Sequence, residues 1–148
     1  MENYNQETNE KLNSLIDIAE DGKEGYESAA KEVKDAALKG SFLLFAKERS
    51  TYASQLREIV NQLRGDAEGH GGDTIGSLHR VWINLKAAFT NGDDAIINAC
   101  ITGEEAAIKE YKLVLDDRLV PQSFKTLIGE QLNGIEKALE SIKSRIEK

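Results

Sequence analysis

The chain has 148 residues, 40% of them hydrophobic and 30% charged, which is the balance of a folded domain rather than of a disordered segment. Its net charge of −7, without any cluster of Lys and Arg, disfavours nucleic acid and membrane surfaces as partners. No apolar run approaches the roughly 20 residues of a transmembrane helix, and the single cysteine, Cys100, excludes an internal disulfide.

Residues 1–10 are polar and acidic, and they lack the basic and apolar regions of a secretory signal. We therefore expect a cytoplasmic protein in which residues 1–148 form one helical domain, with residues 1–7 flexible. The chain has one proline, Pro121, and proline breaks helix interiors. Its scarcity allows long helices over most of the sequence.

Apolar residues recur with helical periodicity in two long segments of the N-terminal half. The first covers residues 8–34 and ends in a tight connection at Asp35. The second covers residues 37–63. A stretch with four glycines, residues 65–72, follows it and predicts a loop.

The C-terminal half repeats this arrangement after a shorter helix. That helix begins at Asp73 or Thr74, either of which is a good N-cap, and ends before residues 91–93. A long helix is predicted over residues 94–116, and the last begins at Pro121, a residue suited to a first turn. The sequence thus predicts an all-α, antiparallel four-helix bundle with a short extra helix in the crossover between its second and third long helices.

Three polar residues interrupt the apolar stripes. Arg49, Glu104 and Gln131 each lie between apolar neighbours on the second, fourth and fifth segments. A buried carboxylate needs a compensating partner, so Glu104 is expected either to pair with Arg49 or to bind a metal. The inward tyrosines Tyr52 and Tyr111, together with Tyr26, can complete such a network through their hydroxyls.

The metal alternative can draw on five candidate ligands. They are Glu20, Glu27, Glu48, His79 and Glu104. A dinuclear carboxylate bundle takes a Glu from each of two helices and a Glu-x-x-His motif from each of the other two. The two histidines, His70 and His79, both lack an acidic residue three positions earlier. We therefore expect a buried polar network of Arg49, Glu104, Gln131, Tyr111 and Tyr52 and no cofactor, with iron or manganese as the alternative.

Several stretches of the chain resemble a bacterial ferritin-like family of four-helix-bundle proteins of unknown function. The resemblance extends from about Leu12 to Ile146 and rests on LNSLIDIAEDGKEGYESAAKEV, AKERSTYASQL, SLHRVWINLKAAF and GEEAAIKEYKLVL. Its most specific elements are Asp21-Gly22, His79-Arg80-x-Trp82 and Gly103-Glu104. Resemblance to ferritin-like proteins at large implies iron or manganese and a role in oxidative stress. Glu104, with Glu27 or Glu20, matches the ligand pattern of those proteins.

These observations predict a non-catalytic protein that acts by association, as a homodimer. The inner polar site would then be a structural relic of a metal site. The alternative is a metal-binding ferritin-like protein linked to the stress response. Trp82 is expected to anchor the crossover helix on the bundle, and His79 to lie at the seam between that helix and the bundle.

Overall fold

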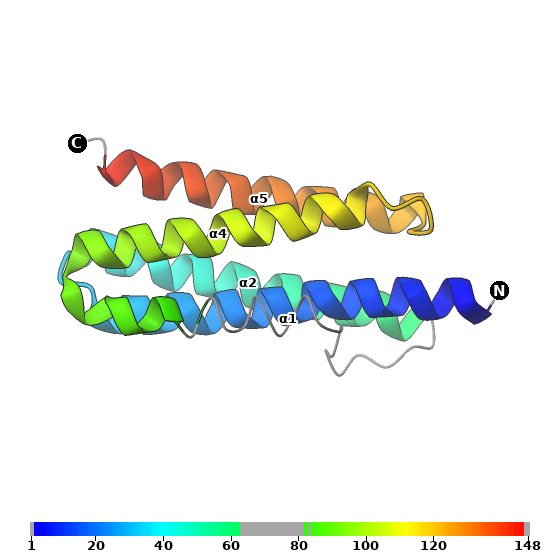
Figure 1. The fold of residues 1–148 in the computed structure, drawn as a ribbon, viewed down its shortest axis with the longest axis horizontal. Coiled ribbons are helices and arrows are strands. Elements are labelled where there is room, and N and C mark those ends of the chain that lie inside the picture. Colours follow the sequence, from blue (N-terminus) through cyan, green and yellow to red (C-terminus); the bar gives the residue numbers. More distant parts are fainter. Residues whose placement is uncertain (1, 63–81, 83, 147–148) are drawn as a thin grey trace.

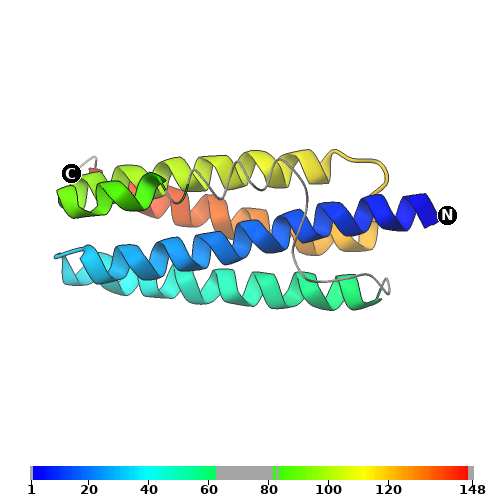
Figure 2. The same cartoon turned by 60° about the horizontal axis from the view of Figure 1, so that its bottom comes forward.

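Four long helices in two antiparallel pairs make up the fold (Figures 1 and 2). The computed structural model describes residues 2–62, 82 and 84–146. Helices α1 (Glu2–Glu32) and α2 (Ala36–Gln62) form one pair, and α4 (Asp93–Leu115) and α5 (Gln122–Ile146) form the other. A short 3₁₀ helix, η1 (Ala87–Asn91), precedes α4 and contacts α1. The all-α class and the order of elements are as the sequence predicts, and the described ranges contain no strand.

The first helix begins earlier than the periodicity indicates, at Glu2 rather than at Thr8. Residues 2–7 contain neither glycine nor proline, so nothing in them stops a helix from extending outward. Thr8 is buried within this helix, and its hydroxyl donates to the carbonyl oxygen of Leu119, 3.3 Å away. The expected flexibility of residues 1–7 stays a prediction.

The crossover region is described only in part. The glycine-rich stretch 65–72, both histidines and most of the predicted third helix lie outside the described residues. Trp82 and residues 84–86 are helical, and the segment ends in η1.

Local chemistry sets the connections between the helices. The Asp35 carboxylate accepts hydrogen bonds from the amides of Ala37 and Leu38 at 2.8 and 3.1 Å, which caps α2. Gly92 adopts φ +105° ahead of α4, a conformation that favours glycine. Helix α5 starts after Pro121, whose carbonyl accepts from the amide of Phe124 at 3.0 Å.

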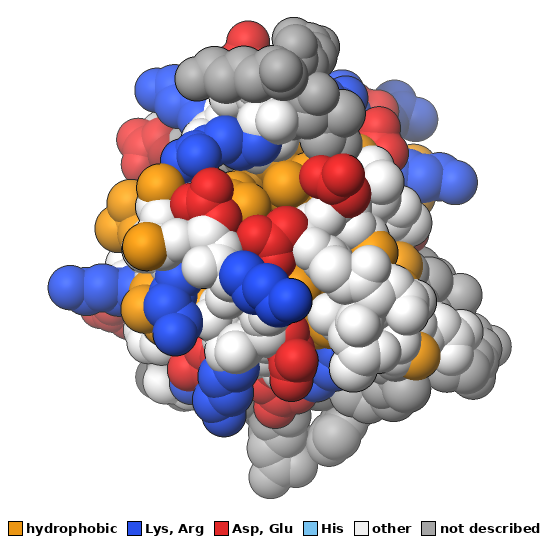
Figure 3. Space-filling view, turned by 90° about the vertical axis from the view of Figure 1, so that its left-hand side faces the viewer, with side chains coloured by type: hydrophobic (Ala, Val, Ile, Leu, Met, Phe, Trp, Pro, Cys, Tyr) orange, Lys and Arg blue, Asp and Glu red, His pale blue; other side chains and the backbone are white. Residues whose placement is uncertain are grey.

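Two contacts join the helix pairs at opposite ends of the bundle. At one end the Asp93 carboxylate accepts from the amides of Lys34 and Asp35 at 2.9 and 3.0 Å, which ties the start of α4 to the α1–α2 connection. Figure 3 views this end, where charged side chains of both signs are interspersed with apolar ones. At the other end Lys11 forms an ion pair with Asp117, beside the contact between Thr8 and Leu119.

The buried apolar residues form two clusters along the bundle. One contains Leu12 to Ile18 of α1 with Leu56 to Val60 of α2, and the other contains Tyr26 to Val33 of α1 with Leu38 to Ala46 of α2. On α4 the same division falls between Cys100 and Ala107. Arg49 and Glu104 lie at this boundary, so the bundle has a buried polar layer between two apolar clusters, whereas Gln131 lies within the first cluster, between Ile128 and Ile135.

Candidate functional site

The centre of the polar layer is an ion pair between two helices of different pairs. Arg49 of α2 and Glu104 of α4 are 2% and 0% exposed, and Nη2 of Arg49 donates to Oε2 of Glu104. This confirms the prediction that the inward arginine compensates the inward carboxylate. The sequence allows Arg49 to lie there because Gly22 of α1 has no side chain, and Arg49 Nη1 lies 3.0 Å from the position of a Cβ at Gly22.

The electrostatics of the pair keep Arg49 charged. Burial on its own lowers the pKa of Arg49, but the carboxylate of Glu104 and the nearby Tyr26 more than offset this and raise the pKa above its ordinary value. The guanidinium also lies over the Tyr26 ring, with Cζ 5.5 Å from the ring centroid. A permanent positive charge is therefore held in the middle of the bundle.

Tyr26 and Cys100 are both buried within the electrostatic influence of the Glu104 carboxylate. Burial raises the pKa of the Tyr26 phenol well above its ordinary value, and the negative charge of Glu104 raises it further. Burial and then Glu104 also raise the pKa of the Cys100 thiol. A thiol in this environment stays protonated and is not an activated nucleophile.

A second polar group lies further along the bundle, around Gln131 of α5. Its side-chain oxygen accepts from the Tyr111 hydroxyl at 2.8 Å. Its side-chain nitrogen donates to Oε1 of Gln55 at 3.0 Å and to the backbone oxygen of Tyr52 at 3.3 Å. Burial raises the pKa of Tyr111, so this hydroxyl stays a donor. The structure thus places the five network residues in two groups, and it adds Gln55, which the sequence pattern did not indicate.

The Tyr52 hydroxyl does not follow the expectation that it bonds Glu104 or Gln131. It lies 3.4 Å from Oε2 of Glu48, which is one helical turn earlier on the same face of α2. Tyr52 is half-buried, and its ring points toward α5, where Gly134 leaves space for the hydroxyl. Tyr52 therefore joins the second group through its backbone carbonyl alone.

The candidate metal ligands do not converge. Glu20 forms an ion pair with Arg57 at 3.0 Å, Glu27 is exposed, and Glu48 approaches Tyr52. His79 lies outside the described residues. Within the described ranges no three His, Cys, Asp or Glu side chains are placed to hold a metal ion. Of the described candidates only Glu104 reaches the interior, and there an arginine already neutralises it, so the described residues do not fit a di-iron or di-manganese centre.

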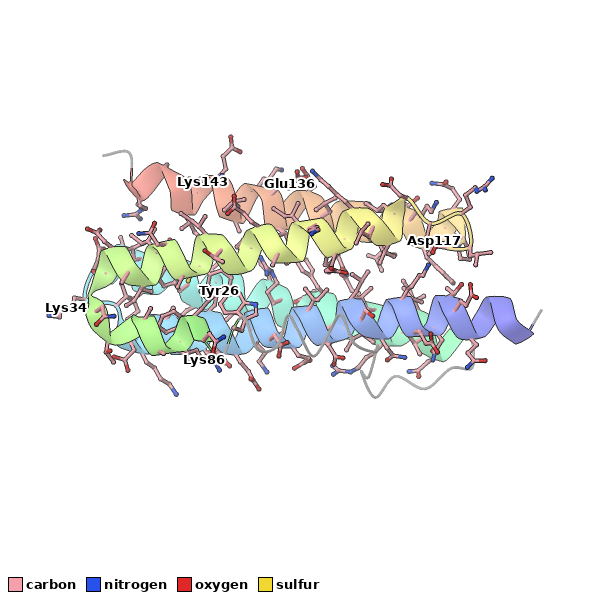
Figure 4. The ribbon with its side chains drawn as sticks, in the orientation of Figure 1. Tyr26, Lys34, Lys86, Asp117, Glu136 and Lys143 are labelled. Carbon is pink, nitrogen blue, oxygen red and sulfur yellow. The ribbon has the colours of Figure 1, made fainter. Side chains whose placement is uncertain are left out.

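Trp82 packs between α1 and α4, against Tyr26, as its predicted anchoring role requires. It is 2% exposed, and its ring packs edge-on against Tyr26 with centroids 6.1 Å apart. A Cβ at Gly25 of α1 would lie 2.3 Å from the indole, and one at Gly103 of α4 would lie 2.4 Å from it. Figure 4 shows Tyr26 projecting from α1 toward the space between the helix pairs.

The glycines of this layer leave room for the side chains packed against them, a role that the sequence pattern did not reveal. Gly22, Gly25 and Gly103 stand in helix interiors, where glycine is less favourable than alanine by about 1 kcal/mol. Glycine at these interior helix positions, despite that cost, is the sequence signal that another side chain packs closely against the helix backbone there. The identity of the contacting side chains follows only from the packing of α1, α2, α4 and the crossover around one point.

Comparison with known protein families shows a match that covers most of the chain. The family described as a domain of unknown function (DUF2383) matches residues 7–117, more than half of the chain, and the chain belongs to this family. The matched range contains Tyr26, Arg49, Trp82 and Glu104 and ends before α5. No curated protein matches the chain. No helix within the described part of the chain is both long and apolar enough to cross a membrane.

Proposed function

We propose that this DUF2383 protein is a ferritin-like helical bundle in which a salt bridge takes the place of a di-metal centre. The observation that carries the proposal is the buried pair of Arg49 and Glu104. The long crossover between α2 and α4, with two hairpin pairs, is the connectivity of ferritin-like bundles. In such bundles inward carboxylates hold cations. Here the arginine supplies the positive charge, so Glu104 needs no metal.

The activity that follows from this arrangement is association rather than catalysis. The two tyrosines and the cysteine of the polar layer have raised pKa values, which suit hydrogen bonding and packing better than acid–base or nucleophilic chemistry. We propose a homodimer as the associated form. Leu43 and Leu44 on α2 support it, because adjacent leucines that are 51% and 55% exposed mark an apolar surface that a second copy can cover.

The metal part of the proposal is tested by elemental analysis. Untagged protein would be loaded with ferrous and manganous salts, desalted, and compared with Glu104→Gln prepared in the same way. We expect both proteins to hold well below one metal ion per chain. Near-stoichiometric metal in the wild type that is lost in Glu104→Gln would overturn the proposal in favour of a metal-binding protein.

The association part is tested separately by light scattering after size exclusion. We expect the mass of a dimer for the wild type and of a monomer for Leu43→Glu/Leu44→Glu. Leu113→Glu is the matched control, since Leu113 is 57% exposed but lies on α4, near the far end of the bundle. A wild-type monomer, or equal masses for all three proteins, would refute the proposed dimer.

A further inference from the structure

Four buried polar atoms of the polar layer make no hydrogen bond of normal geometry with the described residues. They are Tyr26 Oη, Arg49 Nη1, Trp82 Nε1 and Glu104 Oε1. Their side chains are between 0% and 2% exposed, so bulk solvent does not reach them. Buried polar atoms in folded proteins are almost always satisfied, which makes four unsatisfied ones in one place a feature that needs a cause.

These four side chains lie close to one another in the bundle. The Arg49 guanidinium lies 5.5 Å from the Tyr26 ring centroid, and the centroid of the Trp82 ring lies 6.1 Å from it. The indole packs on Gly103, the residue before Glu104, and the Glu104 carboxylate raises the pKa of Tyr26. The atoms come from α1, α2, α4 and the crossover, so no single helix accounts for their meeting.

The hydrogen-bonding chemistry of the four atoms identifies the occupant. Arg49 Nη1 and Trp82 Nε1 only donate, Glu104 Oε1 only accepts, and the Tyr26 hydroxyl does both. A metal cation does not fit, because the guanidinium and indole nitrogens carry protons and cannot be ligands. An anion does not fit either, because the Glu104 carboxylate would repel it. A water molecule accepts two hydrogen bonds and donates two, which matches this set.

We propose that the polar layer is an internal hydration site, in which ordered water bridges Arg49 and Trp82 to Glu104 and Tyr26. Water there accepts from the two N–H groups and donates to the Glu104 carboxylate oxygen and to the Tyr26 hydroxyl oxygen. The site links the crossover to the bundle centre through Trp82. This hydration site goes beyond the proposed salt-bridge function, and its test does not depend on whether the protein forms a dimer.

The test uses the indole N–H, which gives an unambiguous NMR signal because the chain has one tryptophan. We expect a cross-peak between this proton and water, with opposite signs in the laboratory-frame and rotating-frame experiments, as a long-lived internal water gives. The Tyr26 hydroxyl exchanges with solvent and can relay such a signal. The cross-peak should therefore be measured again in Tyr26→Phe, with Tyr52→Phe as the control for loss of a half-buried hydroxyl.

A cross-peak that persists in both variants supports the hydration site. Its absence from the wild type overturns the proposal. Loss of the cross-peak in Tyr26→Phe but not in Tyr52→Phe supports the site if solvent oxygen-17 relaxation dispersion shows that a long-lived water is lost with it, and overturns the proposal if the number of long-lived waters is unchanged. Should Tyr26→Phe fail to fold, oxygen-17 relaxation dispersion of the solvent decides the matter with wild-type protein alone. At least one long-lived internal water is expected, and a count of none refutes the site.

Discussion

Removing the arginine of the central ion pair should reveal how much the bundle depends on it. Arg49→Met keeps most of the side-chain volume but leaves Glu104, which is 0% exposed, without its counter-charge. Loss of one partner of a buried pair costs about 3–5 kcal/mol. For a chain of this length that corresponds to a melting temperature lower by about 6–20 °C.

The double variant separates the pair interaction from other losses. Arg49→Met/Glu104→Leu removes both charges and keeps an apolar volume, and such replacements are often neutral or stabilising. With the single variants Arg49→Met and Glu104→Leu it completes a double-mutant cycle, and we expect urea denaturation to give a coupling energy of at least about 2 kcal/mol, within the range of contacting residues. Arg57→Met is the control, because Arg57 lies on the same helix and its ion pair with Glu20 is partly exposed. It should cost no more than about 1 kcal/mol.

The reasoning would be refuted by additive behaviour. If the double variant lost the sum of the two single losses to within about 0.5 kcal/mol, Arg49 and Glu104 would not stabilise each other. Equal losses for Arg49→Met and Arg57→Met would likewise place Arg49 outside a buried pair.

Three further predictions concern packing, the clamp at one end of the bundle, and pH. Gly103→Ala should lower the free energy of unfolding in urea by about 1–3 kcal/mol, because the added Cβ would lie 2.4 Å from the Trp82 ring. The control Gly129→Ala, whose Cβ would have nothing within 4 Å, should instead raise it by about 0.5–1 kcal/mol. Similar losses for both variants would contradict the packing of Trp82 on Gly103. Asp93→Ala should speed hydrogen exchange at the amides of Lys34 and Asp35 and not at Ala37, whose amide bonds Asp35, and unchanged rates would show that the clamp does not form in solution. Burial raises the pKa of Glu110, so stability is lost as pH rises through the folded-state pKa and the carboxyl ionises. Glu110→Gln should therefore raise the melting temperature at about pH 7 and leave it unchanged at about pH 3. A gain at both pH values would point to another cause.

The fold and the ion pair could be predicted from the sequence because both follow from periodicity. Apolar residues at helical spacing give four long helices, and the same spacing puts Arg49 and Glu104 on inward faces. A buried charge requires a counter-charge, so the pairing of these two follows without coordinates.

The remaining features could not be read from local patterns. The contacts of Trp82 with Gly25 and Gly103 join residues that are far apart in the sequence, and they depend on how the helix pairs and the crossover pack. Gln55 lies at the edge of its helix stripe, so only the position of Gln131 on α5 reveals its role. Periodicity indicates a start of the first helix at Thr8 rather than at Glu2, because the polar residues 2–7 carry no apolar repeat.

An anomalous difference map from crystals grown with excess manganous salt would test the central claim most directly. The account predicts no anomalous peak between α2 and α4, with the Arg49 guanidinium on the Glu104 carboxylate. A peak bound to Glu104, with Arg49 turned away from it, would contradict the account and make the bundle a metal-binding one.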